Sequence, residues 1–377
     1  MYTETRYLTW ANRIFGSVTY NLARGGMRPV PLRELGTPPA LDDPRAWDRL
    51  RGNIARFNAT TAAEVLPALG ATHALWLALS TLVQRGDDVL VELPGYESLS
   101  RIPEGLGANI IPFERSPEDG FAVRPERIAS CLTSRTKVVV MTSPHNPSGV
   151  RTTAYELAEV ARICDSVGAR LLVDEIYAPF GSELGADGVW GQSARHVSPN
   201  IITVSGLSKA YGLGSLRVGW IVADEALVRQ AEHTIQSNLG DPPIAQACLG
   251  AHAFAQLPRI SAARERQFDA SMRTVVARWV ADRPFLGWCE PQDGPFGFVY
   301  VRGGPDLTAV IECGAEQHDV LVAPGSFFGL PNAFRLGWSV DPSQLPAALS
   351  RLEQVLAPVL EHAVHAGRET GKLCRRS

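Results

Sequence analysis

Four short runs of apolar residues along the middle of the chain constrain the fold most strongly. They occupy residues 88–92, 137–141, 170–174 and 200–204. Runs of this length suit strands that are buried on both faces, as in a parallel sheet. Between them lie helical patterns such as residues 154–167, whose apolar positions repeat every three or four residues. This alternation predicts an α/β fold with a mostly parallel sheet and helical crossovers.

Polar residues stand where three of these predicted strands end. Asn146 follows the second run, Asp174 closes the third, and Lys209 follows the fourth. In open α/β sheets the ligand crevice lies at the carboxyl ends of the strands. We therefore expect these three residues, although far apart in the sequence, to meet at one site.

The pattern of the chain changes towards its C-terminal end. Residues 226–283 are mostly helical in pattern, with an interruption at 241–243, and beyond Trp288 short strands and helices alternate again. A chain of 377 residues is long for a single core, so one large and one smaller domain are expected. The expected parts are an N-terminal segment that joins the small domain (1–45), a large domain (46–280) and a C-terminal small domain (281–377).

Charge and spacing argue against several classes of function. A net charge of −3 argues against non-specific binding to nucleic acid or to anionic membranes. The first residues lack the apolar core of a signal peptide, and no stretch has the length needed to span a bilayer, so we expect a cytoplasmic protein. The six cysteines and eight histidines are scattered without metal-site spacing, so no bound metal is expected.

Four motifs follow one another along the second third and the end of the chain. They are Ser143–Gly149 (SPHNPSG), Asp174–Tyr177 (DEIY), Gly206–Lys209 (GLSK) followed by Arg217, and Phe334–Gly337 (FRLG). In order and spacing the chain resembles the class I and II aminotransferases, which are fold-type I pyridoxal-phosphate enzymes. The resemblance covers about residues 60–340. It implies a large domain around a mostly parallel mixed sheet, and a smaller α/β domain built from the N- and C-terminal segments.

The resemblance also implies an activity, namely transfer of an amino group from an α-amino acid to a 2-oxo acid. Lys209 resembles the lysine that binds the aldehyde of pyridoxal phosphate as a Schiff base and later moves a proton at the substrate Cα. Asp174 matches the carboxylate that keeps the pyridine nitrogen protonated. Tyr177 and Asn146 match the residues that contact the phenolic oxygen of the cofactor.

Other matched residues imply contacts to the phosphate, the ring and the substrate. Arg217 resembles the phosphate-binding arginine, because a guanidinium fork suits that dianion. The implied phosphate donors beside it are Gly70, Ala71 and Thr72, at the start of a helix, and the hydroxyl of Ser208. Tyr96 matches the aromatic residue that stacks on the ring. Arg335 matches the clamp for the substrate carboxylate, a site where Asn146 and the backbone of Gly26 are also expected.

The sequence departs from the family pattern at three places. Gly206 stands where many relatives have a serine that contacts the phosphate. Residues 41–51 lack the tyrosine that reaches the cofactor phosphate of the neighbouring subunit in the homodimer that the family implies. The Gly-x-Pro-Asp segment that covers the substrate in many relatives appears only as residues 22–27, a change compatible with an unusual substrate.

Three alternative functions require features that differ from those of this prediction. Residues 212–217 have a partial GxGxxG pattern, but Arg217 replaces the third glycine, which disfavours a nicotinamide oxidoreductase. A regulatory module would need an added basic DNA-binding segment, which the sequence lacks. The strongest alternative is another pyridoxal-phosphate reaction at Cα, as in a lyase, cyclase or oxidase, because the geometry that selects the bond is invisible in sequence. Candidates for the substrate pocket are His145, Phe15, Phe296 and Phe298.

Overall fold

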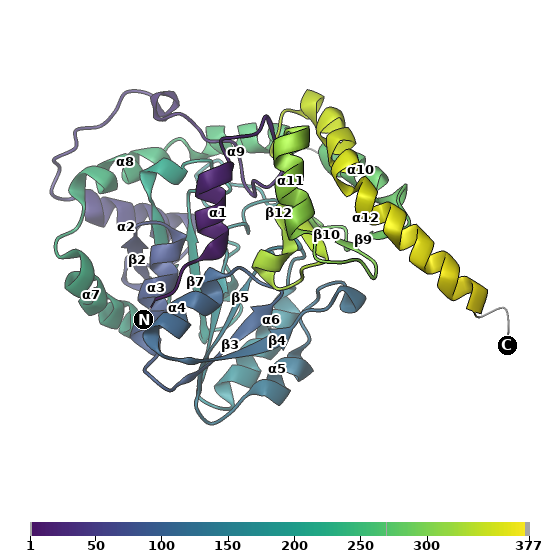
Figure 1. Ribbon diagram of the computed structural model, residues 1–377. Coiled ribbons are helices and arrows are strands. Elements are labelled where there is room, and N and C mark those ends of the chain that lie inside the picture. Colours follow the sequence, from purple (N-terminus) through teal and green to yellow (C-terminus); the bar gives the residue numbers. More distant parts are fainter. Residues whose placement is uncertain (1, 269, 374–377) are drawn as a thin grey trace.

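A seven-stranded sheet forms the centre of the protein in the computed structural model, which describes residues 2–268 and 270–373 (Figure 1). The strand order is β2-β8-β7-β6-β5-β3-β4. All neighbouring strands are parallel except β8, which is antiparallel to both β2 and β7. The strands are β2 (Val65–Ala68), β3 (Asp88–Leu93), β4 (Asn109–Glu114), β5 (Thr136–Thr142), β6 (Arg170–Asp174), β7 (Ile201–Gly206) and β8 (Gly219–Val222). The four predicted runs are β3, β5, β6 and β7, so the α/β prediction is confirmed.

Helices cover both faces of this sheet, which explains why its strands are apolar throughout. Val138 and Val140 of β5 pack in one core with the helices α3, α4 and α7. Val139 and Met141 point to the opposite face and pack with α5 and α6, as the two-residue period of a strand requires. The helices of this part are α2 (Ala46–Phe57), α3 (Ala71–Leu82), α4 (Ser98–Leu106), α5 (Pro125–Cys131), α6 (Ala154–Asp165), α7 (Glu225–Leu239) and α8 (Ile244–Phe254).

A second sheet, of four antiparallel strands in the order β12-β13-β10-β9, lies in the C-terminal part of the chain. The elements here are α9 (Leu257–Gln267), α10 (Ala270–Ala281), β9 (Leu286–Trp288), β10 (Phe296–Val301), α11 (Thr308–His318), β11 (Val320–Leu321), β12 (Ala323–Pro324), β13 (Ala333–Gly337) and α12 (Leu345–Leu373). Figure 1 shows α12 as the long helix that reaches away from the rest of the protein.

The N-terminal segment packs against this C-terminal part. It forms the helix α1 (Arg6–Ile14) and the short strand β1 (Tyr20–Asn21), which pairs with β11 in parallel. Tyr7, Trp10 and Leu22 belong to the same core as β10, β13 and α12. The sequence analysis did not predict α1, although its buried residues are spaced like one face of a helix.

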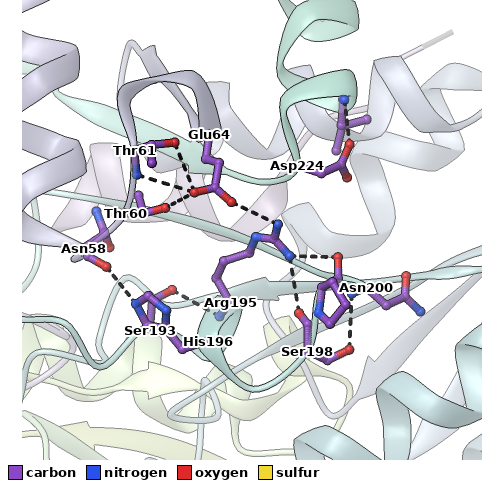
Figure 2. A network of polar contacts seen from close by, with 12 residues as sticks. Asn58, Thr60, Thr61, Glu64, Ser193, Arg195, His196, Ser198, Asn200 and Asp224 are labelled. Atoms are coloured by element: carbon purple, nitrogen blue, oxygen red, sulfur yellow. Dashed lines mark hydrogen bonds and ion pairs between the residues drawn. The ribbon is translucent and has the colours of Figure 1, made fainter.

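A polar network at the amino ends of the strands joins segments that are distant in sequence (Figure 2). Arg195 donates to the carbonyl oxygens of Pro199 (2.8 Å) and Ser198 (3.4 Å), just before β7, and forms an ion pair with Glu64 before β2 (3.2 Å). His196 contacts the carbonyl oxygen of Asn58, after α2 (2.8 Å). The network therefore holds together the amino ends of the strands, on the side of the sheet opposite to Asp174 and Lys209.

Substitution of Arg195 by methionine is expected to destabilise the fold without changing catalysis. The guanidinium is about 10% exposed, so its loss removes shielded hydrogen bonds and lowers the free energy of unfolding by about 1–3 kcal/mol. Urea unfolding measures this change, and kcat/KM should stay within twofold of wild type. Arg229→Met, which removes an exposed ion pair on α7, is the matched control. An unchanged urea midpoint for Arg195→Met would contradict the assigned role.

Candidate active site

A cavity of about 470 Å³ opens at the carboxyl ends of β5, β6 and β7. Every predicted site residue except Gly26 and Gly70 lines it. These two glycines lie against the cavity wall: a Cβ on Gly26 would be 3.2 Å from Cα of Lys209, and one on Gly70 would collide with the guanidinium of Arg217. The structure therefore brings together residues from the N-terminal segment, the central sheet and β13.

Lys209 lies in the turn after β7, beneath the N-terminal segment. Its carbonyl oxygen accepts a hydrogen bond from the backbone N–H of Met27 (2.8 Å). Desolvation in the cavity, together with the positive charge of Arg335, lowers the pKa of Lys209 to about 8, although Asp174 acts in the opposite direction. A lowered pKa increases the fraction of neutral amine, which is the nucleophilic form.

Asp174 ends β6 and is buried. Its Oδ1 accepts a hydrogen bond from the backbone N–H of Ile176 (3.0 Å). Burial raises the pKa of Asp174 to about 7, and the nearby Glu92 adds to this effect. Within the described part of the chain this carboxylate forms no ion pair, so a cationic group in the cavity would relieve its desolvation. A protonated pyridine nitrogen is such a group.

Arg335 is a buried guanidinium in β13, 2% exposed. Its Nη1 donates to Oδ1 of Asn146 (2.7 Å), and its Nη2 donates to the carbonyl oxygen of Ala23 (3.0 Å) and to the hydroxyl of Tyr7 (2.7 Å). Its Nε has no hydrogen-bond partner, and no described carboxylate lies within ion-pair distance of the group. A buried cation without a counter-ion is costly. An incoming carboxylate would supply both the charge and the missing acceptor.

The start of α3 forms an anion site with Arg217. Gly70 is its N-cap with a φ of 90°, so the next residues, Ala71 and Thr72, present free backbone N–H groups at the helix end. The Arg217 guanidinium is held beside them by the carbonyl oxygens of Leu69 and Gly214, each at 3.2 Å. This donor set fits the phosphate of pyridoxal phosphate, and the hydroxyl of Ser208 lines the same cavity.

The structure gives a physical reason for the glycine at position 206. A Cβ there would lie 2.7 Å from the carbonyl oxygen of Val218 and 3.1 Å from Cα of Gly219. A serine would therefore push β7 away from the start of β8, beside the start of α3. The missing hydroxyl follows from close backbone packing at the place where the phosphate donors converge.

A buried network beneath the cavity holds Asn146 in place. The hydroxyl of Thr142 accepts a hydrogen bond from the backbone N–H of Asn146 (2.8 Å) and donates to Glu92. Glu92 is in turn paired with Arg115 (2.8 Å), and both side chains are fully buried. The burial of Glu92 is thus compensated by charge and by hydrogen bonds. This pair was not predicted from the sequence, because Glu92 lies in β3 and Arg115 follows the end of β4.

The four predicted pocket residues lie outside the cavity lining. His145 is fully buried, with its ring nitrogens bonded to the carbonyl oxygen of Pro94 (2.8 Å) and to Ser148 (2.7 Å). Phe298 is fully buried in the C-terminal core, and Phe15 packs on Trp10. Phe296 comes nearest: its ring meets Tyr177 edge-on at 4.8 Å, and the Arg335 guanidinium lies 5.0 Å from it. None of the four candidates therefore lines the cavity: His145, Phe296 and Phe298 are buried in the packed interior, and Phe15 is partly buried against Trp10.

The cavity also contains residues that carried no sequence motif. Tyr7 and Leu8 of α1 line it, as do Thr142, Ile176 and Gly214. The signal that could have identified Tyr7 is its spacing from Trp10 and Ala11, which marks the buried face of a helix. Among the residues of the described ranges, no cluster of side chains suits a metal ion and no helix has the length and apolarity to cross a membrane.

Comparisons with known proteins agree with this geometry. The family model for aminotransferase class I and II matches residues 43–352. The chain is 31% identical to arginine–pyruvate transaminase AruH of Pseudomonas aeruginosa, over 85% of this chain and 83% of that protein. It is 30% identical to capreomycidine synthase of Streptomyces vinaceus, over 97% of this chain and 94% of that protein.

The fold is also found among solved structures. A pyridoxal-phosphate-dependent aminotransferase from Streptococcus suis superimposes with a TM-score of 0.82, covering 95% of this chain and 98% of that one. The two sequences are 23% identical. The central sheet and the smaller C-terminal sheet therefore form the fold-type I architecture.

Proposed function

The chain belongs to the class I and II aminotransferases and is a pyridoxal-phosphate-dependent enzyme; on that premise we propose that Lys209 binds the cofactor and Arg335 the substrate carboxylate. The observation that carries this proposal is the convergence of Lys209, Asp174 and Arg335 on one cavity. The reaction requires a nucleophilic amine, a buried carboxylate and a buried guanidinium, and these three residues supply them. Each of the three lacks a partner that the cofactor or the substrate would provide.

The side chains of the cavity divide the tasks of the reaction among them. Bound pyridoxal phosphate supplies an aldehyde for the substrate amine and a ring that accepts the electrons released at Cα. Lys209 moves the proton at Cα, and Asp174 holds a proton on the ring nitrogen. Tyr177 donates its hydroxyl hydrogen to the phenolic oxygen, beside the Asn146 amide, and Tyr96 restrains the ring. The phosphate is held by the donors at the start of α3 with Arg217 and Ser208.

The direct test is to add amino acids one at a time to the holoenzyme without an oxo acid. An aminotransferase converts its cofactor stoichiometrically to the amino form, and the conversion is reversed by a 2-oxo acid. This is followed by absorbance, with mass spectrometry of the released oxo acid. Failure of every common amino acid to convert the cofactor would contradict the proposal.

Two observations favour a second candidate function, a cyclase. A relative that matches 97% of this chain is named capreomycidine synthase, and the Gly-x-Pro-Asp segment is replaced by residues 22–27. The same experiment distinguishes the two reactions. Catalytic formation of a cyclised product, without conversion of the cofactor to its amino form, would favour the cyclase, whereas catalytic release of ammonia and an oxo acid would indicate a lyase or an oxidase.

The rate at which pyridoxal phosphate attaches to the apo-protein should rise with pH and level off above about 8. Only the neutral amine attacks an aldehyde, and burial lowers the pKa of Lys209 to about 8. The neutral fraction therefore grows roughly tenfold from pH 6 to pH 7 and less than twofold above pH 8. Stopped-flow absorbance measures this rate, with Lys209→Ala as the blank. A rate that climbs steadily to pH 10 would show an ordinary lysine.

We also propose a homodimer, a division into two domains and a cytoplasmic location. The exposure of Thr72 and Arg217 in the single chain supports an interface beside the phosphate site, where the family places a second subunit. The shared core of α1 and the C-terminal sheet supports a small domain built from both ends of the chain. The domain boundary was expected at residues 280/281, and we propose to move it to the start of α10, because Met272, Val276 and Val280 of this helix belong to the same core. The buried free thiols of Cys164 and Cys248 suit a reducing compartment.

A further inference from the structure

The first turn of α1 places the phenol of Tyr7 in the cavity beside Arg335, which we propose to bind the substrate carboxylate. Tyr7 is about 7% exposed, and its hydroxyl oxygen accepts a hydrogen bond from Nη2 of Arg335 at 2.7 Å. The side chain lines the same cavity as Lys209. No motif of the sequence and no family contact described above includes this residue.

The hydrogen-bond arrangement leaves the phenol with a proton to donate. The Tyr7 oxygen accepts from Arg335, while the other donors of that guanidinium go to Asn146 and to the carbonyl oxygen of Ala23. Among the residues that the structure describes, the Tyr7 hydroxyl is seen to accept from Arg335 and is not seen to donate a hydrogen bond. A carboxylate that binds to Arg335 would lie next to this O–H group and could accept its proton in a hydrogen bond.

The phenol is also held rigidly. The backbone N–H of Tyr7 donates to Oε2 of Glu97 (2.9 Å), at the start of α4, while the N-cap residue Thr5 forms no side-chain cap. The Tyr7 ring packs edge-on against Tyr96 at 6.4 Å and against Phe327 at 6.0 Å. Contacts from both parts of the protein therefore orient the hydroxyl before any ligand arrives, which lowers the entropic cost of binding.

We propose that Tyr7 is a second binding group for the substrate carboxylate, donating its hydroxyl hydrogen to the anion that Arg335 holds. This inference rests on the proposed role of Arg335. It predicts that the enzyme distinguishes amino acids from amines partly through the N-terminal helix. A hydrogen bond from the phenol to a charged group should contribute roughly 10- to 100-fold in affinity.

The test compares two unreactive probes on the wild-type holoenzyme and on Tyr7→Phe. One probe is 2-methylalanine, which has a carboxylate but no Cα hydrogen, and the other is tert-butylamine, which has a methyl group in place of the carboxylate and likewise no hydrogen on the amine-bearing carbon. Their dissociation constants are measured by titrating the cofactor absorbance, so no turnover is needed. The expected result is a 10- to 100-fold weaker binding of 2-methylalanine by Tyr7→Phe, with tert-butylamine affected less than twofold.

Trp10→Phe is the matched control, because Trp10 lies on the same buried face of α1 and its indole nitrogen has no partner. It should leave both dissociation constants unchanged. Equal affinities of Tyr7→Phe and wild type for 2-methylalanine would overturn the proposal, as would an equal loss for both probes, which would indicate packing alone. A wild-type protein without preference for the acid would instead contradict the role of Arg335.

Discussion

Replacement of Lys209 by alanine is expected to lower kcat/KM by at least about 10⁴-fold, because one side chain performs two tasks. The amine binds the cofactor, and it moves the proton at Cα. Its position after β7, with a pKa near 8 and Arg335 close by, suits both. The variant should also lose the absorption band of the lysine-bound cofactor. Steady-state kinetics with a converted amino acid, and the absorption spectrum, measure the two effects.

The control for this substitution is Lys137→Ala, since Lys137 is exposed and precedes the buried part of β5. It should keep the absorption band and the full rate. A Lys209→Ala protein that retains more than about 1% of wild-type kcat/KM would contradict the account, because neither task can be taken over by a side chain that lacks an amine.

Replacement of Arg335 by lysine is the second large effect that we expect. Lysine keeps the positive charge but loses the planar fork, and it cannot satisfy Asn146, Tyr7 and the carbonyl oxygen of Ala23 together. We expect kcat/KM for amino acids to fall roughly 10²- to 10³-fold, mostly through KM, because the lost contacts bind the carboxylate in the ground state as well. Steady-state kinetics over a range of substrate concentrations separates the two constants.

Arg302→Lys provides the comparison, because Arg302 is exposed and its guanidinium lies over the ring of Tyr300, outside the lining of the cavity. Its kinetics should match wild type. If Arg335→Lys changes KM by less than threefold, the substrate carboxylate is held elsewhere, and the inference about Tyr7 is then lost with it. The amine probe tert-butylamine should bind the Arg335→Lys holoenzyme about as well as wild type.

The sheet could be predicted from sequence because a strand that is buried on both faces is apolar along its whole length. Val138 to Met141 are apolar at every position, since alternate side chains pack against helices on opposite faces. Asp174 and Lys209 could be placed at one edge by the rule that parallel strands present their carboxyl ends together. Arg335 could be assigned only by resemblance, because the five residues of β13 contain no pattern that indicates a ligand-binding side chain.

The N-terminal part of the site could not be predicted in this way. Tyr7 reaches the cavity because α1 packs into a core formed by residues some 300 positions later, a contact that leaves no local pattern. The Glu92–Arg115 pair is hidden for the same reason, since each partner alone resembles a charged strand end. His145 is the reverse case, a residue that was predicted as a pocket candidate but does not line the cavity. Its ring nitrogens are bonded to a backbone carbonyl oxygen and to a serine hydroxyl.

Reductive trapping tests the central claim most directly. The chain has only three lysines, Lys137, Lys209 and Lys372. Borohydride treatment of the protein reconstituted with pyridoxal phosphate should make the lysine–cofactor linkage permanent, and peptide mass spectrometry then locates it. The account predicts stoichiometric modification of the peptide that contains Lys209. Modification of either other lysine in its place, or no bound cofactor at all, would contradict it.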